Sequence, residues 1–239
     1  MKSDPGNGAA VLVVQNDPHV PPGLVSEALD AASLAHRLIR ADRGEPVPEI
    51  TVAIPALVVL GGTMSVYDTD AHPHLGIVEQ RIREAVDRER PFFGICLGGQ
   101  LLARVLGGTV HLRRHGEKGA RSIHLTEAGR ADPIFAGLDV TVPTFQWHDD
   151  AFVPPPVALR LATAADCPHQ AFRVGDRAYG TQFHPEVTAA IARSWCIHDG
   201  VDPASVMPGF LQTAGAYERA SRRLLANFCE IVREGAAGV

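Results

Sequence analysis

The stretch that decides the fold reads Phe92-Phe93-Gly94-Ile95-Cys96-Leu97-Gly98-Gly99-Gln100-Leu101-Leu102. Residues 92–95 have the pattern of a buried strand, and a helical pattern follows that includes residues 101–106. Cys96 therefore stands at a strand-to-helix turn with a glycine two residues before it and another two residues after it, which is the context of a nucleophile elbow. Such a turn strains the backbone and presents the cysteine to the positive end of a helix, which favours the nucleophilic thiolate. The competing interpretation is an inert cysteine buried in a glycine-rich turn.

The segments before this turn alternate between two periodicities. Residues 11–14 and 57–60 are short apolar runs that predict strands, whereas residues 24–38 and 75–86 carry apolar side chains at helical spacing. Strands that alternate with helices in this way imply right-handed crossovers and a parallel sheet. We therefore predict an α/β fold of three layers, with a mainly parallel central sheet and helices on both faces.

The second half of the chain has a different pattern of predicted secondary structure. Short β-like runs follow one another without a long helix between them, which predicts additional antiparallel strands at residues 121–125, 144–147, 157–163, 170–174 and 178–183. Helical patterns return at 188–195 and 217–232. No repeat or long linker interrupts the chain, so we expect a single domain over residues 1–239, with a core of about 9–195 and a helical extension of about 200–235.

Composition excludes several classes of protein. The chain has 22 Lys and Arg against 27 Asp and Glu, and this net charge of −5 argues against a nucleic-acid partner. No apolar run is long enough to indicate a membrane span or a signal peptide, so we expect a cytoplasmic protein. The four cysteines form no C-x-x-C pair. His72 and His74, like Cys167 and His169, are isolated pairs without a partner pair, so we expect no metal and no cofactor.

A general base for Cys96 is offered by the string Gln182-Phe183-His184-Pro185-Glu186. His184 and Glu186 are two residues apart in extended chain, so their side chains point the same way. A carboxylate so placed can fix the imidazole tautomer while the other ring nitrogen faces a thiol. The alternative interpretation is non-functional: a solvent-exposed strand end at which a histidine and a glutamate occur by chance.

A third element follows the run at 57–60. Gly61 and Gly62 lie where a strand ends, and two glycines can expose a backbone amide to a neighbouring oxyanion. An ordinary strand-to-helix turn would look the same. The carboxyl ends of the strands are, however, where α/β folds bind their ligands.

These three elements, in this order, resemble the class I (triad) glutamine amidotransferase family, and the likeness is closest to the amidotransferase half of GMP synthetase. It runs from about residue 11 to about residue 191, and the segments 106–110 and 145–150 are also typical of the family. The resemblance implies a flavodoxin-like fold and a Cys-His-Glu catalytic triad. The implied residues are Cys96 as nucleophile, His184 as acid and base, Glu186 as its orienting partner, the amides of Gly62 and Leu97 as oxyanion hole, and Gly61, Gln100, His148 and Asp150 as substrate contacts. The sequence departs from the family pattern at Thr63, where proline is usual, and at Asp149, where glycine is common.

The resemblance also implies an activity. We expect hydrolysis of the side-chain amide of glutamine through a cysteine γ-glutamyl thioester, with the ammonia passing to an acceptor reaction on a synthase partner chain, because no Gly-rich phosphate loop is found here. An alternative with the same triad is a γ-glutamyl peptidase or hydrolase that acts on γ-glutamyl amides or peptides. A catalytically silent binding protein on this fold is the second alternative.

Overall fold

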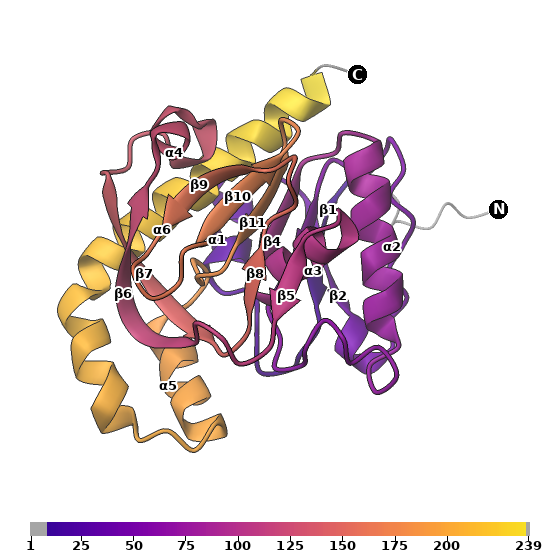
Figure 1. Ribbon diagram of the computed structural model, residues 1–239. Coiled ribbons are helices and arrows are strands. Elements are labelled where there is room, and N and C mark those ends of the chain that lie inside the picture. Colours follow the sequence, from indigo (N-terminus) through magenta and orange to yellow (C-terminus); the bar gives the residue numbers. More distant parts are fainter. Residues whose placement is uncertain (1–8, 238–239) are drawn as a thin grey trace.

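The computed structural model describes residues 9–237, with side chains to residue 236. Helices and strands follow one another along the chain as in Figure 1. The strands are β1 (Val11–Gln15), β2 (His36–Arg40), β3 (Leu57–Val59), β4 (Phe92–Ile95), β5 (Thr109–His111), β6 (Glu117–Leu125), β7 (Thr141–His148), β8 (Ala151–Val153), β9 (Leu159–Thr163), β10 (Ala171–Val174) and β11 (Ala178–Thr181). The α-helices are α1 (Leu24–Ala31), α2 (His74–Asp87), α3 (Leu97–Val105), α4 (Glu127–Ala131), α5 (Ala189–His198) and α6 (Pro203–Ala237).

Nine strands form one sheet in the order β2-β1-β3-β4-β11-β10-β9-β6-β7. The first five in this order pair in parallel, and their arrangement is the 2-1-3-4-5 order of flavodoxin-like doubly wound folds. The remaining four extend the sheet by antiparallel pairing. The α/β prediction is confirmed, with the antiparallel strands confined to one half of the sheet.

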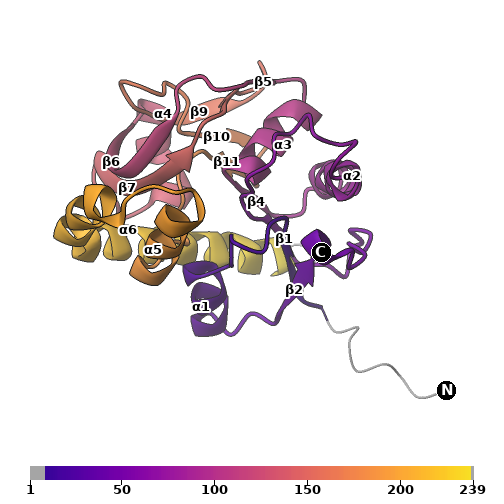
Figure 2. The same ribbon diagram turned by 90° about the horizontal axis from the view of Figure 1, so that it is seen from below.

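Helices cover both faces of this sheet (Figure 2). Helices α2 and α3 pack on one face, and α1 and α6 pack on the other. Strand β1 shows why both faces are apolar: Leu12 and Val14 join the core under α2 and α3, whereas Val11 and Val13 join the core under α1 and α6. Because successive side chains of a strand point to opposite faces of the sheet, this one strand contributes to two separate hydrophobic cores.

One predicted element is wrong. The helical spacing over residues 24–38 ends early, because α1 stops at Ala31 and the chain returns as strand β2, parallel to β1. Ser33 has a φ of 53°, in the left-handed region, which ends the helix. After α1 the helical pattern rests on Ala35 and Leu38 alone, and two positions are too few to distinguish a helix from a strand.

Two helices begin earlier in the chain than the apolar periodicity of the sequence predicted. Helix α3 begins at Leu97, immediately after Cys96, and α6 runs from Pro203, much earlier than the pattern at 217–232. None of the helices in the described part of the chain combines the length and the apolar composition that a membrane crossing requires.

Candidate active site

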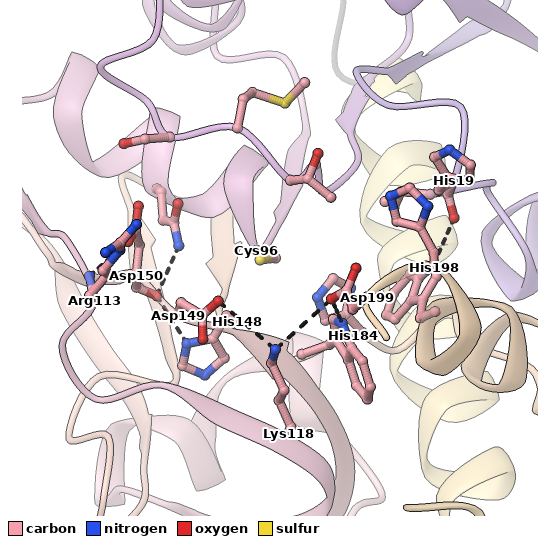
Figure 3. A pocket seen from close by; sticks show the side chains of 18 of the residues that line it. His19, Cys96, Arg113, Lys118, His148, Asp149, Asp150, His184, His198 and Asp199 are labelled. Carbon is pink, nitrogen blue, oxygen red and sulfur yellow. Dashed lines mark hydrogen bonds and ion pairs between the residues drawn. The ribbon is translucent and has the colours of Figure 1, made fainter. Parts of the chain in front are cut away.

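The parallel half of the sheet brings four chain segments to one edge. These segments follow β1, β3, β4 and β11, so Asp17, Gly62, Cys96 and His184 all lie beyond the carboxyl ends of neighbouring strands. A cavity of about 510 Å³ opens there (Figure 3). Six of the nine site residues predicted from the sequence line it: Gly62, Cys96, Gln100, His148, Asp150 and His184.

Cys96 has the strained backbone of an elbow. Its φ is 50°, a left-handed value that is uncommon for a residue with a side chain, and it directly precedes the first residue of α3. The glycines on either side allow the turn to close: a Cβ on Gly94 would lie 2.5 Å from the backbone of Gly98, and one on Gly98 would lie 2.1 Å from the Val59 carbonyl oxygen. The first N–H groups of a helix have no acceptor within the helix, so the Leu97 amide is available beside the thiol.

His184 and Glu186 form a buried pair behind the cysteine. His184 Nδ1 donates to Glu186 Oε1 at 2.7 Å, and the two residues are 2% and 0% exposed. The other ring nitrogen, Nε2, is buried and has no hydrogen-bond partner among the described residues. Burial by itself would lower the pKa of His184, but the charges of Glu186 and of Cys96 outweigh it and raise the pKa well above its ordinary value. The arrangement therefore favours an imidazolium beside Cys96.

The backbone and ring of His184 are held by distant elements that the sequence analysis did not single out. The hydroxyl of Tyr217, on α6, donates to the His184 carbonyl oxygen at 2.7 Å, and the His184 N–H donates to the Phe145 carbonyl oxygen at 2.9 Å. The Trp195 ring on α5 meets the imidazole edge-on, with centroids 4.8 Å apart. The apolar pattern of α5 and α6 predicted helices, but nothing in it predicted these contacts.

The turn at Gly61 and Gly62 passes close to the side chains of both Cys96 and His184. A Cβ on Gly61 would lie 3.1 Å from His184 Cε1 and 3.6 Å from the Cys96 Cβ. Only glycine permits this approach without displacing a neighbour. The next residue, Thr63, uses its N–H and its hydroxyl to bind Asp17.

The remaining predicted contacts meet on the wall opposite His184. Gln100 Nε2 donates to the Asp150 carbonyl oxygen at 3.1 Å, and His148 Nδ1 donates to the same oxygen at 2.9 Å. The Asp150 carboxylate is occupied by the N–H of Arg113, at 2.9 Å. The backbone of Asp150, rather than its side chain, thus joins Gln100 to His148.

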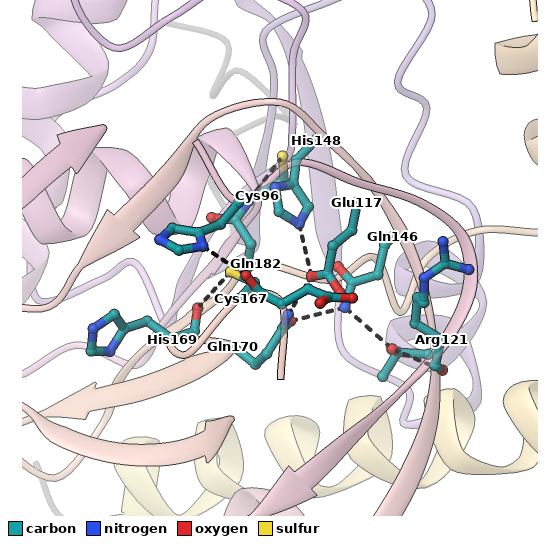
Figure 4. A network of polar contacts seen from close by, with 12 residues as sticks. Cys96, Glu117, Arg121, Gln146, His148, Cys167, His169, Gln170 and Gln182 are labelled. Carbon is teal, nitrogen blue, oxygen red and sulfur yellow. Dashed lines mark hydrogen bonds and ion pairs between the residues drawn. The ribbon is translucent and has the colours of Figure 1, made fainter. Parts of the chain in front are cut away.

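A buried polar network lies behind His148 (Figure 4). His148 Nε2 is 3.3 Å from Glu117 Oε2, and the same oxygen accepts a bond from Gln170 Nε2 at 2.6 Å. Because Nδ1 already donates to a carbonyl oxygen, a hydrogen bond at Nε2 requires an additional proton on either His148 or Glu117. Glu117 was missed from the sequence, since a single glutamate in a polar run carries no signal until the register pairs it with His148.

Glu117, His148 and Cys167 are also a possible metal-ligand set, with ligand atoms within 4.8 Å of one another. The bonds just described already use the Glu117 oxygen and both ring nitrogens of His148. Burial and the charge of Glu117 raise the pKa of the Cys167 thiol to about 12, which opposes the thiolate form that metals bind. These donors fit a hydrogen-bonded network better than a metal centre.

The outer part of the cavity is polar and aromatic. Lys118 Nζ lies 4.0 Å from Asp149 and 3.9 Å from Asp199, and 5.3 Å from the centre of the Trp147 ring. Trp147 Nε1 donates to Asp199 at 2.7 Å and so links β7 to the residue that follows α5. All four residues line the cavity, and Lys118 lies between Asp149 and Asp199 (Figure 3).

Comparison with known proteins gives consistent results. The model of the class-I glutamine amidotransferase family matches residues 28–201. A glutamine amidotransferase-like protein of Salmonella typhimurium, YfeJ, is 34% identical over 61% of this chain and 62% of its own length. The GMP synthase of Thermus thermophilus is 37% identical over 59% of this chain. The match spans 27% of that enzyme.

Solved structures resemble nearly the whole chain. A glutamine amidotransferase from Thermotoga maritima has a TM-score of 0.82 and 27% identity, covering 93% of this chain and 98% of that one. A glutamine amidotransferase from Methylobacillus flagellatus has a TM-score of 0.84 and 27% identity, covering 95% of both chains.

Proposed function

Because this chain belongs to the class-I glutamine amidotransferase family, we propose that it hydrolyses the side-chain amide of glutamine with Cys96, His184 and Glu186 as catalytic triad. The observation that carries the proposal is the buried His184–Glu186 pair, whose second ring nitrogen has no hydrogen-bond partner among the described residues and whose histidine lines the same cavity as Cys96. A silent binding protein would have no need of a strained cysteine beside a buried imidazole and carboxylate.

In the first half-reaction the Cys96 thiolate attacks the amide carbon of glutamine. The C–S bond forms, and the carbonyl electron pair moves to oxygen, where the N–H groups of Gly62 and Leu97 stabilise it. As the tetrahedral intermediate collapses, the C–N bond breaks and His184 Nε2 gives its proton to the departing nitrogen. The products are ammonia and a γ-glutamyl thioester.

In the second half-reaction His184 acts as base. It takes a proton from water, the oxygen of which attacks the thioester carbon, and the C–S bond breaks to release glutamate and the thiolate. Glu186 orients the imidazole and stabilises its charged form in both steps. Gln100, His148 and Asp150 form the wall that would hold the glutamyl part of the substrate, together with Gly61 beside Cys96.

We further propose that the ammonia serves an acceptor reaction on another protein. The curated relatives include GMP synthases, in which the matched region is about a quarter of the enzyme. A cytoplasmic location would keep all four cysteines of this chain, which are unpaired, in the thiol form.

A second candidate is hydrolysis of a larger γ-glutamyl amide or peptide. The observation that favours it is the size of the cavity, about 510 Å³, which Lys118, Trp147 and Asp199 line together with the triad residues Cys96 and His184, so that a leaving group larger than ammonia has room. The triad would act in the same way, with an amine in place of ammonia.

The deciding experiment measures kcat/KM of the purified chain with glutamine and with a series of γ-glutamyl amides and dipeptides. For an ammonia supplier we expect modest activity that favours glutamine and rises when a synthase partner is added. High activity that needs no partner and prefers a γ-glutamyl conjugate would establish the second candidate instead. No turnover of any of these substrates would overturn both.

A further inference from the structure

Two glycines in succession give the turn at Gly61 and Gly62 more backbone freedom than an oxyanion donor tolerates. Gly62 carries the N–H assigned to the oxyanion, and such a donor works only if it is already aimed before the reaction. In the family pattern a proline, which has a fixed φ, usually follows the glycines, whereas this chain has Thr63. We therefore expect other contacts to hold the turn in place of a proline.

The segment that follows β1 holds this turn from both sides. Strands β1 and β3 pair in parallel, so Asn16 and Asp17 lie beside the end of β3. Asn16 Nδ2 donates to the Leu60 carbonyl oxygen at 3.0 Å, just before the glycines. Asp17 Oδ2 accepts the N–H of Thr63 at 3.1 Å and its hydroxyl at 2.5 Å, just after them. Only Gly61 and Gly62 lie between these two attachments.

Asp17 is itself firmly fixed. It is 4% exposed, and its other oxygen, Oδ1, accepts the N–H of His19 at 2.8 Å. The carbonyl oxygen of Asp17 accepts a bond from Gln15 Nε2 at 2.9 Å, and that of His19 accepts one from Trp195 Nε1. Burial would raise the pKa of Asp17, but the hydrogen bonds from Thr63 and His19 outweigh it, so the pKa lies below its ordinary value. The carboxylate that holds the turn is thus ionised throughout the neutral range.

We propose that Asp17 is a positioning residue for catalysis, which acts through Thr63 to aim the Gly62 N–H at the oxyanion of the tetrahedral intermediate. The bond from the Thr63 N–H fixes the peptide plane that follows Gly62, which is a bond that proline cannot make. This inference rests on the proposed function, since it assigns a role within that reaction. It goes beyond the reaction by assigning to a carboxylate on a neighbouring loop the role that a proline usually has.

The test uses three variants at the two residues. In Asp17→Asn the new amide nitrogen must face a donor whichever way it is turned, because both oxygens accept backbone N–H bonds. Thr63→Val removes the hydroxyl and keeps the N–H, and Thr63→Ser keeps both. Thr63 is exposed, so its two variants leave the core unchanged.

A matched control is Asp132→Asn. Asp132 is likewise buried, at 3% exposed, and accepts a backbone N–H from Ile134 and a side-chain bond from Arg173. It lies at the start of a short 3-10 helix, outside the cavity. A loss of activity caused only by removal of a buried carboxylate would appear in this control as well.

We expect kcat for the substrate that the wild type turns over to fall about 100-fold in Asp17→Asn and about 10-fold in Thr63→Val, with KM within about 3-fold of wild type. Thr63→Ser and Asp132→Asn should retain kcat within about 3-fold. kcat is therefore expressed per folded enzyme, with the folded fraction measured by circular dichroism, because a smaller folded fraction would lower the apparent kcat and leave KM unchanged. Unchanged kcat in both Asp17→Asn and Thr63→Val would overturn the proposal.

A second measurement separates this proposal from the proposed function. The thiolate of Cys96 can attack the acetyl carbon of p-nitrophenyl acetate, which forms an acetyl thioester and releases p-nitrophenolate through the same kind of oxyanion. The Cys96-dependent burst, corrected with Cys96→Ala, should slow in Asp17→Asn and Thr63→Val by factors similar to those for kcat. If no glutamyl substrate is turned over but the burst slows, the proposed function fails and the role of Asp17 stands. A burst that is unchanged in both variants overturns that role.

Discussion

The two halves of the central sheet contribute to the site in different ways. The parallel half supplies Cys96, His184 and the Gly62 turn from adjacent loops at one edge. The antiparallel half supplies a wall, in which Glu117 and Lys118 begin β6 and His148 ends β7. The first set holds the proposed reactive groups, and the second set holds the proposed substrate contacts.

This difference indicates that one sheet can carry the groups for the reaction in one half and the groups for substrate binding in the other. Parallel strands joined by crossovers place their carboxyl ends side by side, so reactive groups from segments far apart in sequence converge without special contacts. The antiparallel wall depends on strand register and on a buried hydrogen-bond network. We therefore expect substitutions in the parallel half to change kcat and substitutions in the wall to change KM.

The largest effect is expected from Cys96→Ala. Turnover should fall by about 10⁴-fold or more while the fold remains, because no other thiol lies at the elbow. An electrophilic glutamine analogue followed by mass spectrometry should give one adduct, on Cys96. Cys196→Ala is the control and should keep full activity, since Cys196 is buried in α5. Labelling mainly at Cys167, Cys196 or Cys229 would refute the assignment.

The next largest effect is expected from His184→Ala. Loss of one well-placed acid and base costs about 10²- to 10⁴-fold in kcat, and in the proposed mechanism His184 transfers protons in both half-reactions. Glu186→Gln should cost less, since the proposed role of Glu186 is to orient and stabilise the ring without transferring a proton. Steady-state rates of the two variants give the order directly. A near-wild-type rate in His184→Ala would make His148 the next candidate for the base.

A change in pH dependence is expected from Glu186→Gln. The negative charge of Glu186 helps to hold the pKa of His184 above its ordinary value of 6.5. Without that charge the imidazolium loses its proton at a lower pH, so the alkaline limb of kcat/KM should move to lower pH. Profiles of wild type, Glu186→Gln and the exposed control Glu127→Gln measure this shift. An alkaline limb that stays in place would show that another group controls it.

The smallest effect is expected in the wall. Glu117→Gln weakens the hold on His148, which shares the Asp150 carbonyl oxygen with Gln100. We expect KM for the preferred substrate to rise about 10-fold, with kcat within about 3-fold of wild type. Arg121→Gln, at an exposed position of the same strand, should change neither constant. A fall in kcat with constant KM would remove the distinction between the two halves.

Much of the fold followed from local pattern. Residues 11–14, 57–60, 92–95 and 178–183 predicted four of the five strands of the parallel half, although 178–183, which is β11, was expected among the antiparallel strands and pairs in parallel with β4. The turn at Cys96 predicted the junction of β4 and α3. Strand β2 was missed because its pattern continued the helical spacing of α1, and only pairing with β1 selected the strand. Tertiary pairing overrode a weak helical preference in that segment.

The same division applies to the candidate site. The sequence by itself determined the pairs that depend on neighbouring residues: the glycines that flank Cys96, and His184 two residues before Glu186. Only the tertiary structure decided that Glu117 faces His148 across β6 and β7, and that Asp17 reaches Thr63 across β1 and β3. Neighbours along the chain are related by backbone geometry alone, whereas cross-strand partners depend on register, and a shift of one residue would turn each of these side chains to the opposite face.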